Sequence, residues 1–149
     1  MINSSVLWQY SMFDGLEKEQ IDHILNLMKQ EVFEEGEDIV VEEGPNDKIH
    51  FILEGRVSVI KHEVTLMELE EGDVFGEMEV LEILPVEATI RAALKTKLLT
   101  LSVGALGELF EDDIKTYSFI VTNLARDLSR RLRRMNVRVM KESPVSDWN

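Results

Sequence analysis

The segment from Gly72 to Ala92 (GDVFGEMEVLEILPVEATIRA), called here the 72–92 loop, has the residue types and spacing of an anion-binding site. It starts with a Gly-Asp turn and runs through Phe75-Gly76-Glu77. A short apolar stretch broken by Pro85 follows, and the loop leaves as a strand from Ala88 to Ala92. A glycine followed by a short helix and a proline turn presents backbone N–H groups to an anion.

The side chains of the 72–92 loop carry the wrong charge for that role. Loops of this kind usually add an arginine, whose planar guanidinium holds the anion through two hydrogen bonds. Here the nearest charged side chains are Glu77, Glu79, Glu82 and Glu87. The shape of the loop indicates an anion site, whereas its charge disfavours one.

The composition favours one domain with a hydrophobic core, since 44% of the 149 residues are hydrophobic. There is no apolar run long enough for a membrane span and no secretory signal at the N-terminus. The absence of cysteine excludes disulfides, thiolate zinc sites and cysteine nucleophiles, and it fits a reducing cytoplasm, where we expect the protein to act. His23, His50 and His62 share no metal-ligand spacing, so we expect no metal and no cofactor.

The net charge of −13 is unevenly distributed. Residues 1–112 hold 8 Lys and Arg against 25 Asp and Glu, whereas residues 113–149 hold 8 against 4. An acidic body repels DNA and anionic membranes, and a basic tail can pair with that body or contact another molecule.

The hydrophobic pattern predicts a mainly β protein with flanking helices. Apolar residues recur at helical spacing from Glu17 to Lys29, and we expect Asp14 to cap this N-terminal helix. Short β-branched or alternating runs separated by turn residues then predict an antiparallel barrel or jelly roll of about eight strands, with a short helix inside the 72–92 loop. These runs are Val32–Phe33, Ile39–Val41, Ile49–Leu53, Val57–Ile60, Val64–Leu69, Ala88–Ala93 and Lys97–Ser102.

A long C-terminal helix is predicted from Ile114 onward, after a short helix around Leu106–Phe110. Its apolar stripe continues to Val139, and some 28 helical residues span about 42 Å. One small β domain cannot cover that length, so we predict a homodimer through this helix. The dimer contacts would be Tyr117, Val121, Leu124, Leu128, Leu132 and Met135. Residues 1–112, the N-terminal helix and barrel, and residues 113–149, the helix and tail, are expected to form one structural unit.

Five stretches in order along residues 11 to 141 resemble the cyclic-nucleotide-binding domain family, the sensor module of catabolite-activator-type regulators, cyclic-nucleotide-dependent kinases and gated channels. They are Phe13–Leu16, Glu35–Val40, Glu43–Asp47, Ile49–Val59 and Leu69–Glu77. The resemblance implies the same barrel and a stand-alone, non-catalytic sensor module.

In that family the loop after the sixth strand is a phosphate-binding cassette, written FGE, a short helix and P-R-A-A-T. The resemblance implies that Gly76 and nearby amides face the phosphate and that Glu77 faces the ribose 2′-hydroxyl. Pro85 also matches the cassette pattern. The implied ligand-binding residues are Phe75, Gly76, Glu77, Met78, Val86, Glu87, Ala88 and Thr89.

The family's phosphate-binding arginine has no counterpart here. Val86 stands nine residues after Glu77, Glu87 stands ten after it, and Arg91 lies farther along the outgoing strand. A lost charge-assisted hydrogen bond costs roughly 1.5–3 kcal/mol. Glu87 at about 5 Å from a phosphate adds about 3 kcal/mol of repulsion at an effective dielectric near 20. We therefore expect cyclic AMP and cyclic GMP affinities about three orders of magnitude or more below the family's usual ones.

Direct DNA binding is not expected. Eight residues follow Lys141, so we expect no helix-turn-helix domain in this chain. The arginines of the last helix spread around its circumference, so we interpret them as a solvated or ion-pairing surface. They are Arg130, Arg131, Arg133, Arg134 and Arg138.

Three functions remain open. The first is a regulatory module that senses another small molecule or has lost its ligand. The second is a dimeric scaffold whose pocket is filled by Leu81, Ile83, Leu84 and Val86, and the third is a cyclic nucleotide receptor with a different phosphate site. A filled pocket would favour the scaffold, and an open cavity lined by Glu77 would favour a sensor. An enzyme of the cupin type would need a His/Glu metal cluster, which the histidine positions disfavour.

Overall fold

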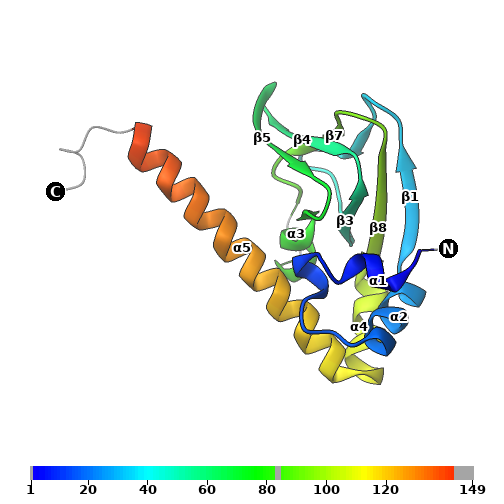
Figure 1. The fold of residues 1–149 in the computed structure, drawn as a ribbon. Helices are drawn as coiled ribbons and strands as arrows, with labels where there is room; N and C mark the ends of the chain where they lie inside the picture. Colours follow the sequence, from blue (N-terminus) through cyan, green and yellow to red (C-terminus); the bar gives the residue numbers. More distant parts are fainter. Residues whose placement is uncertain (1, 83–84, 143–149) are drawn as a thin grey trace.

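Two four-stranded antiparallel sheets form the body of the protein in the computed structural model, which describes residues 2–82 and 85–142 (Figure 1). The strand orders are β1-β8-β3-β6 and β2-β7-β4-β5. This jelly-roll-like barrel confirms the predicted fold class. The strands are β1 Lys29–Phe33, β2 Asp38–Val40, β3 Lys48–Glu54, β4 Arg56–Lys61, β5 Val64–Glu70, β6 Val74–Phe75, β7 Thr89–Ala92 and β8 Thr96–Ser102.

Helices flank the barrel as expected, with α3 inside the 72–92 loop and the long α5 at the C-terminal side. In Figure 1, α1, α2 and α4 gather at one end of the barrel, and α5 runs past it so that its second half leaves the body. The helices are α1 Ser4–Leu7, η1 Ser11–Phe13, α2 Lys18–Leu27, α3 Glu77–Glu82, α4 Val103–Asp112 and α5 Ile114–Glu142.

The N-terminal helix differs from the prediction at both ends. It ends at Leu27, because Lys29 already pairs with Thr100 of β8. Its cap is Glu17, whose backbone N–H donates to Gln20 Oε1 at 2.8 Å. Asp14, the expected cap, instead ends η1 and donates its own N–H to a backbone carbonyl there.

Two apolar clusters follow from the alternation of side chains along β3. Ile49 and Phe51 pack toward the helices, whereas Ile52 faces the barrel interior. The helical cluster includes Ile120 and Leu124, which anchor the first half of α5. The barrel cluster consists of Val40, Ile52, Val57, Leu69, Phe75, Val86, Ile90 and Leu98.

A buried amide fixes α5 to the N-terminal segment. Asn123 Nδ2 donates to the backbone carbonyls of Met12 and Asp14, each at 2.9 Å. Beyond Leu124 the helix loses this cover, and Leu132 and Met135 are 60% and 52% exposed. The 72–92 loop lies beside this transition, which places it against the part of α5 that leaves the body.

Candidate ligand site at the 72–92 loop

Gly76 begins the site by turning the chain from β6 into α3. Its φ is +84°, a left-handed conformation, and a Cβ there would lie 2.7 Å from both Asn46 Nδ2 and the Lys48 carbonyl oxygen. The Gly76 carbonyl accepts a hydrogen bond from Asn46 Nδ2 at 3.0 Å. A glycine is therefore required here both by backbone conformation and by space.

Glu77, the first residue of α3, is 3% exposed and pairs with α5 rather than with solvent. Arg131 Nη1 donates to Glu77 Oε1 at 3.2 Å, and Arg131 Nη2 donates to the Val74 carbonyl at 2.7 Å. Burial raises the pKa of Glu77 above its ordinary value, and the Arg131 guanidinium opposes that rise. One arginine thus joins β6, α3 and α5.

Arg131 is a site residue that the sequence reasoning missed. The interpretation as a solvated or ion-pairing surface holds for Arg130, which pairs with Asp127 at 3.1 Å, but Arg131 is turned inward. Arg131 lies seven residues after the buried Leu124, two helical turns along the same face. That spacing is the signal that could have identified it.

His50 lies next to Gly76, since a Cβ on that glycine would be 2.9 Å from His50 Nδ1. Its ring stacks on Phe75 with centroids 4.6 Å apart and an interplanar angle of 5°. Nδ1 of His50 is buried and has no hydrogen-bond partner among residues 2–82 and 85–142. Burial lowers the pKa of His50 to about 4, so the ring is neutral at pH 7.

The outgoing part of the 72–92 loop is tied to the β2–β3 connection. Val86 is 3% exposed within the barrel cluster, and its N–H donates to the Gly44 carbonyl at 3.1 Å. The Val86 carbonyl accepts from Glu43 N–H at 2.7 Å, and Thr89 Oγ1 accepts from Glu42 N–H at 3.0 Å. The isopropyl group of Val86 therefore packs into the barrel at this point of the loop.

A cavity of about 450 Å³ opens beside Val86. Three carboxylates and one ammonium group contribute to its lining, so its side-chain charge is negative. Lys61 is the cation, and it was not among the expected site residues. The lining residues are Glu42, Glu43, Lys61, Pro85, Val86 and Glu87.

The remaining expected ligand residues lie outside this buried centre. Met78 is 50% exposed, Glu87 is exposed and Ala88 is partly buried. Arg91, on the outgoing strand, is engaged elsewhere, since its Nε donates to Asp38 Oδ1 at 2.7 Å. Among the expected ligand residues, Phe75, Glu77 and Val86 are therefore the buried ones.

Of the four residues suggested to fill the pocket, Val86 is buried in the barrel. Leu81 is 46% exposed and does not fill it. Ile83 and Leu84 lie outside the described residues.

The expected dimer residues divide between two environments. Tyr117 and Leu124 pack in the chain's own helical cluster, and Val121 and Leu128 are partly buried. Leu132 and Met135, farther along α5, are exposed. The apolar stripe therefore serves the chain's own core in its first half and is uncovered in its second.

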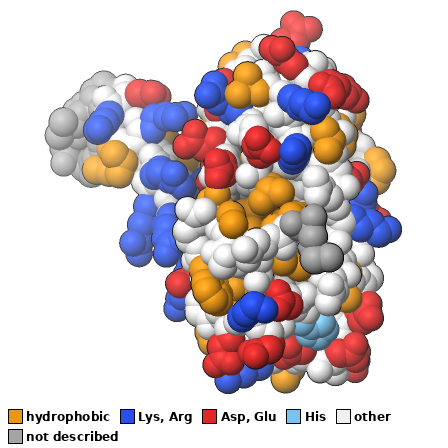
Figure 2. Space-filling view, turned by 45° about the vertical axis from the view of Figure 1, so that its right-hand side comes forward, with side chains coloured by type: hydrophobic (Ala, Val, Ile, Leu, Met, Phe, Trp, Pro, Cys, Tyr) orange, Lys and Arg blue, Asp and Glu red, His pale blue; other side chains and the backbone are white. Residues whose placement is uncertain are grey.

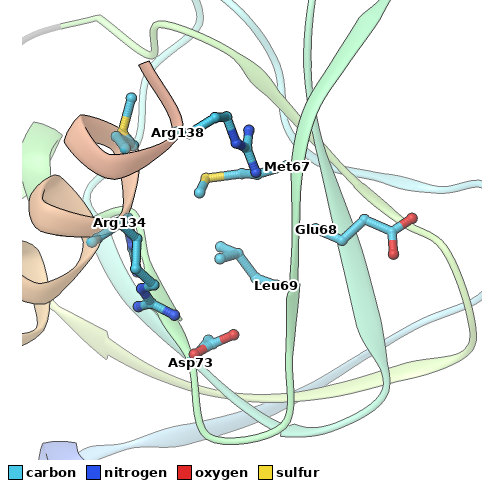
Figure 3. Close-up of a pocket in the computed structure, with 8 residues that line it drawn as sticks. Met67, Glu68, Leu69, Asp73, Arg134 and Arg138 are labelled. Carbon is cyan, nitrogen blue, oxygen red and sulfur yellow. The ribbon is translucent and has the colours of Figure 1, made fainter. Parts of the chain in front are cut away.

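A second cavity, of about 210 Å³, separates β5 from α5 (Figure 3). Arg134, Met135 and Arg138 line it from the helix, and Met67 and Leu69 line it from the strand. Figure 2 shows several Lys and Arg side chains on the projecting helix, beside a body on which both acidic and basic side chains are scattered.

Among residues 2–82 and 85–142, none of the helices combines the length and the apolar character that a membrane-spanning helix needs. No group of three or more His, Cys, Asp or Glu side chains there is placed to hold a metal ion.

Sequence relatives include receptors and ion channels. The chain is 28% identical over 131 residues to the cyclic AMP receptor protein of Thermus thermophilus, covering 82% of this chain and 57% of that protein. It is 25% identical over 130 residues to the potassium channel KAT1 of rice, covering 85% of this chain and 18% of the channel. The chain thus spans less than two thirds of either relative.

Solved structures share the fold. A cyclic nucleotide-binding domain from Methylobacillus flagellatus superposes with a TM-score of 0.85 at 23% identity, covering 94% of this chain and 82% of that one. The catabolite activator protein of Thermus thermophilus superposes with a TM-score of 0.75 at 26% identity, covering 87% and 61%. The family model of the cyclic nucleotide-binding domain matches residues 30–113, more than half of the chain. The chain belongs to the cyclic nucleotide-binding domain family.

Proposed function

We propose that this protein is a non-catalytic regulatory module that does not bind cyclic AMP or cyclic GMP through the cassette in the manner its family uses. The observation that carries the proposal is Val86, which packs in the barrel cluster where the cassette pattern counts a phosphate-binding arginine. Glu87 follows it and lines the adjoining cavity.

The charge around that cavity supports the same conclusion. Glu42, Glu43 and Glu87 outnumber Lys61, so an entering phosphate meets net repulsion. Lys61 is also the cation best placed to pair with the phosphate of a nucleotide. A receptor with a different phosphate site would therefore depend on Lys61.

The regulatory output of such a module is the position of α5. The Arg131–Glu77 pair links the 72–92 loop to that helix without any ligand. A conformational change in the 72–92 loop would therefore alter the contact that holds α5 at the point where the helix leaves the body. The relatives are named as receptors and channels, which favours a regulatory over a catalytic role.

A dimeric scaffold is the second candidate, and the exposed residues of α5 favour it. Leu132, Met135 and Val139 are each 48–60% exposed on a helix that projects from the body (Figure 1). A second copy pairing along this stripe would bury them. In either role we expect a cytoplasmic protein, an expectation that rests on its cysteine-free composition.

A charge reversal at Glu87 tests the proposal. Glu87→Arg places a cation at one of the family's arginine spacings on an exposed site, so folding is unaffected and cyclic AMP affinity rises at least about tenfold. The matched control is Glu108→Arg, an exposed position on α4 with the same charge change. The proposal fails if the wild type already binds as tightly as the Glu87→Arg variant.

A further inference from the structure

The outer surface of α4 combines exposed apolar residues with acidic ones. Val103, Gly107 and Phe110, called here the α4 patch, stand at i, i+4 and i+7 and lie within about 60° of one another around the helix. The side chains of Val103 and Phe110 are 49% and 48% exposed. Glu108 and Glu111 border the patch, and α4 contains no Lys or Arg. An exposed apolar surface with a charged border is typical of a protein–protein interaction site.

Gly107, at the centre of the α4 patch, is not explained by the packing of the described residues. A Cβ added there would meet nothing within 4 Å, and a glycine inside a helix is less stable than an alanine. The bare backbone does allow a second helix to approach closely, since the distance between packed helices depends on the side chains at their contact. Beside it, the Phe110 ring is held by an edge-to-face contact with Tyr117, 5.1 Å between centroids. A fixed aromatic ring beside a glycine suits a preformed docking surface.

A surface of opposite charge lies on the outer half of α5. Arg133, Val137 and Met140, called here the outer α5 patch, repeat the i, i+4 and i+7 spacing of the α4 patch. Val137 and Met140 are 50% and 58% exposed, and Arg133 is exposed. Arg130 and Lys141 border this patch. Each patch extends over about 10 Å of helix, so the two match in length as well as in charge.

The outer α5 patch is separate from the other surfaces of that helix. At 100° per residue, its centre lies about 130–140° around the helix from the centre of the residues that line the cavity toward β5. It lies about as far from the exposed stripe of Leu132, Met135 and Val139. A contact through the outer α5 patch therefore leaves both of those surfaces free.

The α4 patch and the outer α5 patch cannot meet within one chain. α5 is one continuous helix from Ile114 to Glu142, so Arg133 lies about 28 Å from its start. α4 is about 15 Å long and packs beside the start of α5, whereas the outer half of α5 projects from the body (Figure 1). The two complementary surfaces can therefore meet only between different copies of the chain.

The charges that border the two patches are available for such a contact. Among residues 2–82 and 85–142, Glu108, Glu111 and Arg133 form no ion pair within 4.0 Å. Arg130, in contrast, already pairs with Asp127 at 3.1 Å. Arg133 is therefore the cation of the outer α5 patch that a neighbouring carboxylate would meet.

We propose that the α4 patch of one copy binds the outer α5 patch of a second copy. The apolar residues of the two helices pack together, and Glu108 and Glu111 pair with Arg133 and Lys141 at the border. Because the two patches differ, the contact is head to tail and leaves one patch free at each end for a further copy. The inference goes beyond the proposed function and does not depend on it, since no nucleotide takes part in the contact.

Sedimentation equilibrium of the full chain tests the contact in a Leu132→Glu background. That substitution removes the exposed stripe, so the association that remains belongs to another surface. Because each patch is short, we expect a dissociation constant of about 1 mM or tighter, an association that dilution during size-exclusion chromatography would hide. A variant that stays monomeric up to about 1 mM overturns the inference.

A substitution at the centre of the α4 patch locates the contact. Gly107→Arg places a bulky cation where its own chain leaves open space, so it folds normally and weakens association at least about tenfold. Asn26→Arg makes the same charge change at an exposed position of α2 and leaves association unchanged. Thermal unfolding checks that both variants fold. Equal losses in the two variants would overturn the inference.

Charge reversals identify the pairing between copies. Glu111→Arg and Arg133→Glu each weaken association, because each replaces attraction by repulsion across the contact. The first variant lowers the net negative charge by two and the second raises it by two, so general repulsion between copies would move them in opposite directions.

Mixing the two reversed variants gives the sharpest result. An equimolar mixture of Glu111→Arg and Arg133→Glu offers matched charges at every contact and restores wild-type association, as does the double variant in one chain. A mixture that associates no better than its components overturns the inference. Nucleotide titrations do not enter this test, so failure of the contact and failure of the proposed function appear in different measurements.

Discussion

Arg131 in α5 donates a hydrogen bond to the buried carboxylate of Glu77 at the start of α3, across 54 residues of sequence. Both side chains are largely removed from solvent, at 18% and 4% exposure. Because the same arginine also binds the Val74 carbonyl, the 72–92 loop and α5 cannot separate without leaving polar groups unpaired.

Replacing Arg131 by methionine should destabilise the protein. The variant leaves Glu77 buried without its cation, and breaking a buried pair costs roughly 3–5 kcal/mol in the free energy of unfolding. Urea unfolding measures the loss. Since burial already raises the pKa of Glu77, lowering the pH protonates the orphaned carboxyl and should reduce the loss.

Arg133→Met is the control for that experiment, because Arg133 is exposed on the same helix. We expect it to change the unfolding free energy by no more than about 0.5 kcal/mol. Equal effects of the two variants would mean that the Arg131–Glu77 contact contributes nothing specific.

His50 should give the protein an acid-sensitive step. Burial lowers its pKa from 6.5 to about 4, so the unfolded chain binds a proton first as the pH falls. Stability is therefore lost between about pH 6.5 and about pH 4, by up to about 3 kcal/mol. Glu31 raises and Lys48 lowers the His50 pKa, and the raised pKa of Glu77 acts in the opposite direction on stability.

Comparing how the stability of two histidine variants depends on pH isolates the contribution of His50. His50→Phe keeps an aromatic ring against Phe75 and removes the titrating group, so urea midpoints should fall less steeply on acidification. His62→Asn changes an exposed histidine whose left-handed backbone asparagine tolerates, and it should retain the wild-type slope. An unchanged slope in His50→Phe would refute this assignment.

Two glycine substitutions should have opposite effects on the stability of the protein. Gly76→Ala forces a left-handed alanine against Asn46 and Lys48, and we expect at least about 1–2 kcal/mol of destabilisation. Gly107→Ala lies in α4 with open space around the added methyl, and it should stabilise by about 0.5–1 kcal/mol. Thermal unfolding of both variants checks the pair, and a neutral Gly76→Ala would contradict the tight turn.

Self-association through α5 can be tested at Leu132. Size-exclusion chromatography with light scattering should show a wild-type dimer, and Leu132→Glu should shift it to monomer by placing a charge in the exposed stripe. Ser129→Glu, an exposed position about 60–120° away from Leu132, Met135 and Val139 around the helix, should leave the dimer intact. A monomeric wild type at all concentrations would exclude the dimer.

The barrel was predictable because its strands repeat a short local pattern. Alternation such as that of Val57, Ser58 and Val59 and turn residues such as Gly55 are properties of neighbouring residues, and both were visible in the sequence. The ends of the helices were harder to predict. Asp14 and Glu17 offered two caps for α2, and in the structure Asp14 ends η1 while its carbonyl accepts a hydrogen bond from Asn123, more than a hundred residues away.

The candidate site was predictable only for those of its residues that lie in one continuous stretch of the sequence. Gly76, Glu77 and Val86 lie within one loop and could be read from the cassette pattern. Arg131 and Lys61 reach the site from α5 and β4, so their roles depend on how distant elements pack. Charge alone could not separate Arg131 from Arg130 or Arg133, because only packing decides which arginine faces inward.

Titration calorimetry of the purified protein with cyclic AMP and cyclic GMP tests the central claim most directly. With Val86 in the barrel and Glu42, Glu43 and Glu87 outnumbering Lys61, we predict no saturable binding below the millimolar range. A dissociation constant in the micromolar range or tighter for either nucleotide would contradict the account.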